Sequence, residues 1–209
     1  MRKPILVVIS GPSGAGKTTI IKAVLSRRKD LIFSVSCTTR PRRPGEVHGK
    51  DYFFITEQEF RKMIERDEFI EWAEVHGHLY GTPRKFIDKA FKEGKSVLLD
   101  IDVQGAMKVM ETFSDGVFIF VAPPSMEDLE KRLRKRGTES DEDIKRRLED
   151  AKWELGFMER FEYLIINDDL DDAIDKLNSI ITAEGIKIKR LEDEIRMYKE
   201  EVIGGGKEE

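Results

Sequence analysis

One eight-residue loop constrains this chain more than any other feature of its sequence. Residues 11–18 fit the pattern G-x-x-x-x-G-K-[ST] and connect an apolar, β-branched run (Ile5–Ile9) to a helical pattern (Thr18–Arg28). Glycines let the backbone N–H groups of such a loop curl around a phosphate, and the helix N-terminus adds partial positive charge. The pattern predicts a nucleoside triphosphate site; the competing interpretation is a glycine-rich turn with an incidental lysine. The predicted triphosphate-binding residues are Gly11, Pro12, Ser13, Gly14, Ala15, Gly16, Lys17 and Thr18.

Two side chains of this loop have separate expected roles. Lys17 is expected to reach the β- and γ-phosphates, while the Thr18 hydroxyl is expected to coordinate Mg²⁺. A second metal-site candidate is Asp100, which ends the apolar run Val97–Leu99 as a Walker B carboxylate does. We expect Asp100 to hold the metal through water rather than to act as a base. Asp102 follows two positions later and projects from the same side of an extended chain.

Short apolar runs and helical patterns alternate along most of the chain. Such alternation predicts an α/β fold of three layers, in which a parallel sheet has helices on both faces. Further buried-strand candidates are Leu31–Ser36, Ser96–Ile101, Val117–Val121 and Tyr163–Ile166. The helical patterns that separate them lie around Lys85–Lys92, Gly105–Thr112, Met126–Arg136 and Asp141–Arg160.

The stretch Asp51–Tyr80 has a different pattern. Its predicted elements are the short strands Tyr52–Ile55, Glu68–Val75 and Leu79–Tyr80, with a helix near Glu57–Arg66. Because these elements do not form a strand–helix–strand crossover, they predict an inserted α+β lobe. The two tryptophans, Trp72 and Trp153, are expected to pack in the core or in this lobe.

Composition narrows the class of protein. Among 209 residues there is a single cysteine, Cys37, so a disulfide scaffold is excluded. The longest apolar run, Val117–Pro124, is far shorter than the roughly 20 residues of a membrane span. The N-terminal apolar stretch runs directly into glycines and a lysine, unlike a signal peptide. We therefore expect a cytoplasmic protein that binds neither membrane nor nucleic acid.

The net charge of -4 conceals an asymmetry along the chain. Residues 1–50 contain 11 lysines and arginines against two acidic residues, a local balance of +9. Such a concentration favours an anionic ligand near the N-terminal third, although composition alone leaves ordinary solvated faces equally open.

Two further basic segments are candidates for phosphate contacts. In residues 36–46, prolines stiffen a segment with three arginines in four positions, and guanidinium groups bind phosphate oxygens bidentately. Residues 131–147 hold eight positive residues interrupted at 137–140, which predicts two helices joined by a mobile flap. For each segment, the alternative is an ordinary solvated surface.

Beyond the phosphate loop, the chain contains a series of short motifs: SCTTRPRRPGE (36–46), GKDYFF (49–54), FIEWA (69–73), YGTP (80–83), DIDVQG (100–105), RGTE (136–139) and INDDL (166–170). With these motifs in this order, the chain resembles the guanylate kinase family from about Ile5 to Ala183. The resemblance implies a P-loop NTPase-type core with an inserted GMP-binding lobe and a helical lid. It also implies transfer of the ATP γ-phosphate to GMP, and to dGMP, with Mg²⁺ as cofactor.

Residue by residue, the resemblance assigns roles in the acceptor site and the lid. The residues expected to bind the GMP phosphate are Arg40, Arg43, Tyr52 and Tyr80. Those expected to recognise guanine are Ser36, Glu71, Thr82 and Asp102. Arg136 and Arg147 resemble lid arginines that reach the transferred phosphate, so the expected catalytic residues are Lys17, Asp100, Arg136 and Arg147. Asn167 and Asp168 are expected to contact adenine, and Arg42 receives no role.

The chemistry of guanine suits a carboxylate such as Glu71, which can accept hydrogen bonds from both N1–H and N2–H₂. Adenine offers only an acceptor at N1, and an unpaired buried acceptor costs roughly 1–3 kcal/mol. The attacking oxygen of GMP is already anionic, so no general base is required. Positioning and charge neutralisation are expected to supply most of the catalysis.

We expect the core to comprise residues 1–36 and 82–183, with the lid at about 131–147 and the GMP lobe at 37–81. Residues 184–209 are expected to form a C-terminal helical extension and a disordered tail. Apolar residues recur there at helical steps on both sides of Glu184, which is expected to interrupt the pattern. The part from Lys187 is expected to dock on its own chain; pairing with a partner chain, and hence a homo-oligomer, stays open.

Two other functions compete with an active kinase of ATP and GMP. The first is an inactive module of similar fold that binds a phosphorylated or acidic peptide, against which Lys17, Thr18 and Asp100 argue. The second is a P-loop kinase with a different acceptor, against which Ser36, Glu71 and Asp102 argue together.

Overall fold

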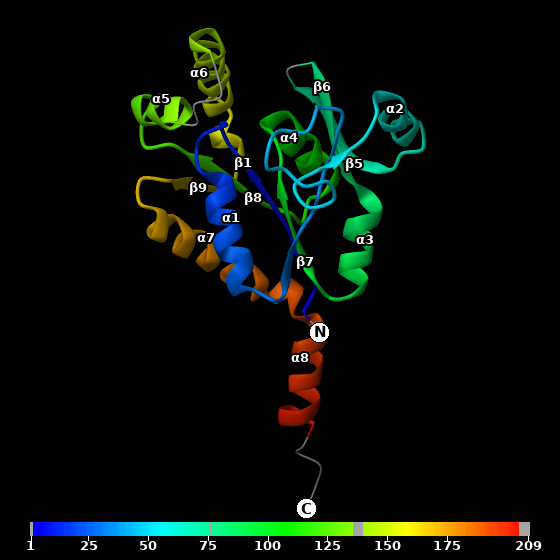
Figure 1. Ribbon diagram of the computed structural model, residues 1–209. Helices are drawn as coiled ribbons and strands as arrows, with labels where there is room; N and C mark the ends of the chain where they lie inside the picture. The colour runs from blue at the N-terminus through cyan, green and yellow to red at the C-terminus, as the bar shows by residue number, and fades with distance from the viewer. Residues whose placement is uncertain (1, 76, 136–139, 205–209) are drawn as a thin grey trace, which may run out of the picture.

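A parallel sheet of five strands forms the centre of the computed structural model, which describes residues 2–75, 77–135 and 140–204 (Figure 1). The strand order is β2-β7-β1-β8-β9, and all neighbouring pairs run parallel. The strands are β1 (Leu6–Ser10), β2 (Leu31–Phe33), β7 (Ser96–Asp100), β8 (Val117–Ala122) and β9 (Tyr163–Ile166). Every residue of β1 and β8 is buried, as expected of strands with neighbours on both sides and helices on both faces.

Alternate side chains of this sheet enter two hydrophobic clusters. Val7 and Ile9 pack toward helices α1 (Lys17–Arg27) and α7 (Leu170–Gly185). Leu6 and Val8 pack toward α3 (Arg84–Lys92) and α4 (Val103–Thr112) on the other face. The predicted three-layer α/β fold is therefore confirmed, and the alternation follows from the two-residue repeat of a strand.

A second sheet lies beside the C-terminal ends of the parallel strands (Figure 1). Its order is β4-β3-β6-β5, with β3 (Cys37–Thr38), β4 (Phe53–Phe54), β5 (Phe69–Val75) and β6 (His78–Pro83). Helix α2 (Glu57–Glu65) covers it by burying Phe60 against Phe69. Thr56 and Glu59 form a capping box that starts α2 at its observed residue.

Two helices rise next to the phosphate loop at the same end of the central sheet (Figure 1). They are α5 (Met126–Lys135) and α6 (Asp141–Leu155), which pack together through Leu129, Leu133 and Ala151. Ser140 caps α6 by accepting a hydrogen bond from the Asp143 N–H. A short 3₁₀ turn, Met158–Arg160, follows α6, so the predicted helix Asp141–Arg160 ends earlier than expected.

Glu184 interrupts the apolar pattern of the C-terminal part of the chain, as expected, but it does so at a buried position. It lies one residue before the end of α7 at Gly185, and its side chain is 2% exposed. Its carboxylate accepts a hydrogen bond from the Tyr163 hydroxyl and pairs with Lys187 at 2.5 Å. A buried acid with such partners is tolerated inside a helix.

Arg190 then connects the C-terminal part of the chain to Asp115 and to Lys3, which precedes β1. Its guanidinium, 1% exposed, donates to the Asp115 side chain and to the Asp115 carbonyl at 2.9 Å each. The Arg190 carbonyl accepts from the Lys3 N–H at 3.0 Å, and Lys3 Nζ lies 3.3 Å from Asp115 Oδ2. The expected docking on the same chain therefore holds as far as Arg190, in the 3₁₀ turn Ile188–Arg190.

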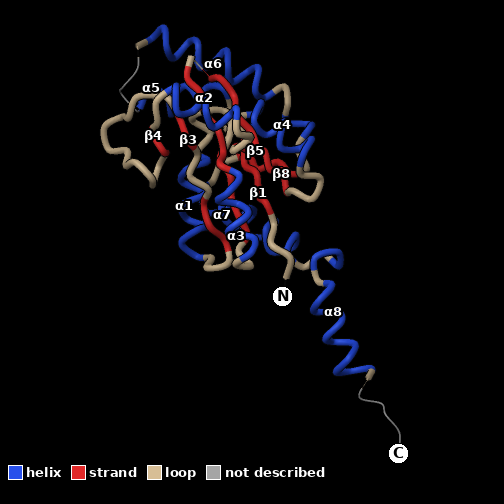
Figure 2. The backbone as a smooth tube through the Cα atoms, turned by 90° about the vertical axis from the view of Figure 1, so that its right-hand side faces the viewer, coloured by secondary structure: helices blue, strands red, loops and turns tan. Residues whose placement is uncertain are grey.

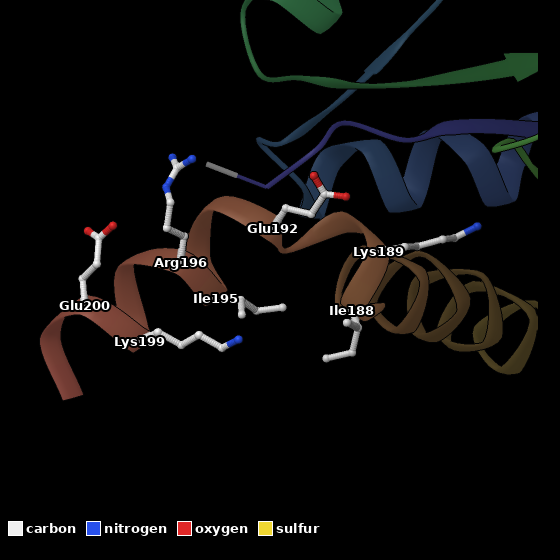
Figure 3. A pocket seen from close by; sticks show the side chains of 7 residues that line it. All are labelled: Ile188, Lys189, Glu192, Ile195, Arg196, Lys199 and Glu200. Atoms are coloured by element: carbon white, nitrogen blue, oxygen red, sulfur yellow. The ribbon is translucent and has the colours of Figure 1, made fainter. Parts of the chain in front are cut away.

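Beyond Arg190 the described residues show much weaker docking, represented by the exposed ion pair between Arg2 Nε and Glu194 Oε1 at 3.5 Å. Helix α8 (Glu192–Tyr198) and the π-helical turn Lys199–Ile203 point away from the body (Figure 2). Met197 and Tyr198 are more than half exposed. Figure 3 shows a shallow hollow on this segment, with Ile188 and Ile195 pointing to one side. The expected disordered tail falls mainly on residues 205–209, which lie outside the described part of the chain.

Within the described residues, no helix has both the length and the apolar character that a membrane span requires.

Candidate active site

The phosphate loop has the backbone conformation that its glycines allow. Gly11, Gly14 and Gly16 have φ values of 133°, 98° and 97°, a region that residues with a side chain rarely adopt. A Cβ on Gly11 would lie 2.1 Å from the Val121 carbonyl oxygen, and one on Gly16 would lie 2.1 Å from the Asn167 amide nitrogen. The loop is therefore fixed in place by close contact with β8 and with the residue after β9.

Lys17 bridges the loop and the adjacent strand. Its ammonium donates to the carbonyls of Gly11 at 2.5 Å and Pro12 at 3.3 Å, and lies 3.9 Å from Asp100 Oδ1. Asp100 ends β7, the neighbour of β1, which brings this carboxylate to the loop. Burial raises the pKa of Asp100, and Lys17 opposes the shift. Thr18 is exposed in the first turn of α1 and faces the same cleft.

At the opposite wall, Arg40 is held by backbone, carboxylate and aromatic groups. It donates to the Pro41 carbonyl and to Glu46 Oε1, both at 2.7 Å, and its guanidinium carbon lies 5.6 Å from the centre of the Tyr52 ring. Tyr52 meets Tyr80 edge to face at 5.9 Å. The Arg43 side chain is exposed and lines the cleft, so the predicted phosphate binders come together on one wall.

Glu71 is the best-enclosed acid of the predicted guanine site. Its side chain is buried on β5, and its Oε1 accepts from the Thr82 hydroxyl at 2.5 Å. Ser36 Oγ lies 3.4 Å from Thr82 Oγ1, which joins a third predicted residue to the same group. Burial, with a contribution from the Asp102 charge, raises the pKa of Glu71 to about 7. Asp102 itself caps α4 by accepting from the N–H groups of Gln104 and Gly105.

The predicted lid residues are placed in part. Arg147, on α6, donates to Ser13 Oγ of the phosphate loop at 3.1 Å. Arg136 lies outside the described residues. The Asn167 amide is buried and donates to the Ala15 carbonyl at 2.7 Å, while Asp168 is exposed.

Most of these groups line one cleft of about 620 Å³. The cleft runs from the phosphate loop to the wall of Arg40 and Glu71, and α6 contributes Arg147 to its border. The phosphate loop and the predicted acceptor-phosphate wall, with the Glu71 carboxylate beside it, therefore share one continuous space. This arrangement can align a bound phosphate donor with a second, smaller phosphorylated ligand.

The structure also shows functional candidates that sequence reasoning missed. Glu154 lies two turns after Arg147 on α6 and lines the cleft; burial raises its pKa to about 7. Arg132, on α5, donates to the carbonyls of Ala15 and Asn167 at 3.3 and 2.8 Å. Arg132 belongs to the basic segment 131–147, so the sequence contained a signal for it. Glu154 lies in a helix with many charged residues, and nothing in the sequence distinguishes it from the others.

Neither tryptophan is a core residue: Trp72 lies on β5 of the lobe, one of the two expected places, whereas Trp153 lies on α6. Trp72 and Trp153 are 38% and 51% exposed. Trp72 carries Lys108 over its ring at 4.8 Å, and Trp153 contacts Phe157 edge to face at 4.7 Å. Large aromatic rings near a surface are stabilised by such contacts without being enclosed.

Comparison with known proteins agrees with this geometry. The guanylate kinase family model matches residues 2–184. The guanylate kinase of Thermotoga maritima is 58% identical over 199 residues, covering 95% of this chain and 96% of that protein. That of Caldanaerobacter subterraneus subsp. tengcongensis is 52% identical over 202 residues, covering 97% and 98%. The crystal structure of guanylate kinase from Anaplasma phagocytophilum superposes with a TM-score of 0.80 at 36% identity, covering 97% and 96%.

A phosphate loop, a second anion-binding wall and a match along nearly the whole chain lead to one conclusion: the chain belongs to the guanylate kinase family and is a nucleoside monophosphate kinase, a phosphotransferase.

Proposed function

We propose that the chain transfers the γ-phosphate of ATP to GMP, giving ADP and GDP, and that it also accepts dGMP. The observation that carries the proposal is the buried Glu71 carboxylate, held by Thr82 in the same cleft as the phosphate loop. A carboxylate in this position can accept from guanine N1–H and N2–H₂ and would face a lone pair on adenine. Sites built on such hydrogen bonds can discriminate by about 10⁴-fold.

The acceptor phosphate is proposed to bind at the wall of Arg40, Arg43, Tyr52 and Tyr80. Arg40 donates to Glu46 and Pro41 through its two Nη atoms, which fixes the plane of the guanidinium. Guanidinium groups have five N–H donors, so others are left for phosphate oxygens. Ser36, Thr82 and Asp102 surround the base, and Asn167 and Asp168 remain proposed contacts for adenine.

Transfer itself needs only a bond exchange at phosphorus. A phosphate oxygen of GMP forms a bond to the γ-phosphorus as the bond from that phosphorus to the β-bridging oxygen breaks and ADP leaves. No proton has to be removed from the nucleophile, so the work of the site is positioning and neutralising charge. Lys17 now donates to the Gly11 and Pro12 carbonyls, and we propose that phosphate oxygens replace these acceptors.

The residues present fit a bound Mg²⁺. Asp100 has a pKa raised by burial, with Lys17 as a cation 3.9 Å away, and an enclosed carboxylate of this kind favours a nearby divalent ion. Thr18 and Asp100 would hold the metal, the latter through water. When bound, Mg²⁺ would neutralise charge on the donor phosphates.

Helices α5 and α6 are the proposed lid over the core, with 37–81 as the GMP lobe. Arg147 already contacts Ser13, so a small movement of α6 would bring this guanidinium to a phosphate in the loop. Arg136 is proposed to act with it. An inactive interaction module is the weaker alternative, because it needs neither Lys17 against Asp100 nor Arg147 against the phosphate loop.

A coupled assay of ADP release with GMP, dGMP, AMP, UMP and dTMP as acceptors tests the proposal. We expect turnover with GMP and dGMP only. Turnover with AMP as efficient as that with GMP would contradict the assignment of the acceptor site, and no turnover with any acceptor would favour the interaction module.

A further inference from the structure

The first turns of α4 meet strand β5 at an unusually close contact. Gly105 lies in α4 among residues of ordinary helical conformation, and its φ is not in the positive range where glycine is favoured. In such a position alanine has a higher helix propensity than glycine. The backbone of α4 therefore gives no reason for a glycine here, so the reason has to come from a neighbour.

That neighbour is the Glu71 carboxylate. A Cβ on Gly105 would lie 2.7 Å from Glu71 Oε2 and 3.2 Å from Glu71 Cδ, both shorter than ordinary van der Waals contact. The carboxylate has little freedom to move away, because it is buried and its other oxygen accepts from Thr82 at 2.5 Å.

Lys108 holds the same helix against the same strand, and Asp102 caps the helix at Gly105. Lys108, one turn after Gly105, donates to the carbonyl of Trp72 and lies over the Trp72 ring. Asp102, at the start of α4, accepts from the Gly105 N–H at 3.0 Å. Glu71 therefore accepts from one predicted base contact, Thr82, and lies near enough to another, Asp102, for the Asp102 charge to raise its pKa.

We propose that Gly105 is a positioning residue for guanine recognition: the absence of a side chain lets the Glu71 carboxylate lie against α4 and face the base together with Asp102. This inference rests on the proposed function, because it assumes that Glu71 binds guanine. A methyl group at this position would rotate or displace the carboxylate while leaving the phosphate loop intact.

Steady-state kinetics of Gly105→Ala test the proposal, with Gly185→Ala as the matched control. Gly185 is also a helical glycine, at the end of α7, and a Cβ there would meet nothing within 4 Å. For Gly105→Ala we expect the KM for GMP to rise at least tenfold, with the KM for ATP and the kcat at saturating GMP nearly unchanged. For Gly185→Ala we expect wild-type kinetics, and we expect neither variant to lower the thermal unfolding midpoint.

A double-mutant cycle with Glu71→Asp separates positioning from general damage. The shorter side chain withdraws its carboxylate from α4, so the GMP penalty of Gly105→Ala should be several-fold smaller in the Glu71→Asp background. An equal penalty in both backgrounds, or an unchanged KM for GMP in Gly105→Ala, would overturn the inference. If the wild-type protein did not phosphorylate GMP, the proposed function would fail instead, which the same assay shows before any variant is compared.

Discussion

At one end of the cleft the phosphate loop presents the backbone of eight consecutive residues, whereas at the other end the predicted base contacts are side chains from residues 36 to 102. The loop depends on glycines whose φ values are positive, a backbone conformation that forms an anion-binding concavity. The base end depends on one buried carboxylate and the groups that hold it. In the proposed function, the charged groups that assist transfer and the groups that select the acceptor therefore lie at opposite ends of the cleft. Variants at the two ends should then affect kcat and the KM for GMP separately.

Lys17→Ala should have the largest effect, because it removes the one lysine of the phosphate loop. We expect kcat to fall on the order of 10³-fold, as for other groups that stabilise developing charge. GMP binding, measured by calorimetry without ATP, should stay unchanged. Lys85→Ala removes an exposed lysine from α3 and serves as the control. Loss of GMP affinity in Lys17→Ala would break the proposed separation of the two ends.

Glu71→Gln should act at the base end alone. A neutral amide cannot accept from both guanine donors, so kcat/KM for GMP should fall about 10- to 100-fold, the equivalent of 1–3 kcal/mol. The KM for ATP should not change. Glu74→Gln is the matched control, since Glu74 lies on the same strand but is exposed. A Glu71→Gln enzyme with full selectivity for GMP over AMP would refute the guanine assignment.

The pH dependence of kcat/KM for GMP should sharpen this result. Because burial raises the pKa of Glu71 to about 7, its ionised form is lost as the pH falls through 7, and kcat/KM should then fall about tenfold per pH unit. The charged neighbours that set this pKa are Asp102, which raises it, and Lys108, which lowers it. The acidic limb should be absent in Glu71→Gln. A limb that persisted there would point to Glu154, whose pKa is also about 7.

The raised pKa of Glu71 also determines whether the free energy of unfolding rises or falls with pH. The folded protein favours protonated Glu71, so this contribution to the free energy of unfolding is complete below about pH 4.5 and is lost as the pH rises through 7. Denaturant titrations at several pH values, compared between wild type and Glu71→Gln, measure it. A difference with the opposite sign would contradict the burial of this carboxyl group.

Thr82→Val should give the smallest effect. It removes the hydroxyl that donates to Glu71 Oε1, and a single hydrogen bond to a charged group contributes about 1.5–3 kcal/mol at most. Because Val still fills the space, we expect only about a fivefold loss of kcat/KM for GMP at high pH. The acidic limb should move to higher pH, since the Thr82 hydrogen bond lowers the pKa of Glu71. Thr82→Ser should behave as wild type; a Ser variant as impaired as the Val variant would exclude this role of the hydroxyl.

Much of this molecule could be predicted from its sequence, for reasons that differ between regions. The phosphate loop and the alternating strands are local patterns, so their type was predictable and is confirmed. The boundaries of the elements were less predictable. The second strand was expected to reach Ser36 but ends at Phe33, after which the chain leaves the parallel sheet and enters β3. The burial of Glu184 was not predictable, because its partners Tyr163, Lys187 and Arg190 are visible only in three dimensions.

The roles of the site residues came from a resemblance, and the structure adds what spacing alone could not supply. It shows that Thr82 donates a hydrogen bond to Glu71 and that Asn167 donates one to the carbonyl of Ala15 in the phosphate loop. It also shows that Glu154 lines the cleft. None of these contacts is local in sequence, so no periodicity indicates them. The roles of all the site residues toward nucleotides, Lys17, Glu71 and Arg147 among them, stay predictions.

The contacts of Arg190 with Lys3 and Asp115 indicate where the chain can be circularly permuted. The Lys3 nitrogen and the Arg190 carbonyl oxygen are 3.0 Å apart, so the two ends of the folded body are neighbours at the N-terminal end of the parallel strands, remote from the cleft. A circular permutant that joins residue 191 to residue 2 through a short glycine linker, with new termini in the exposed turn around Gly94, should keep the same fold. Residues beyond the linker point, including α8, would be dispensable for that body and free to be exchanged for other sequences.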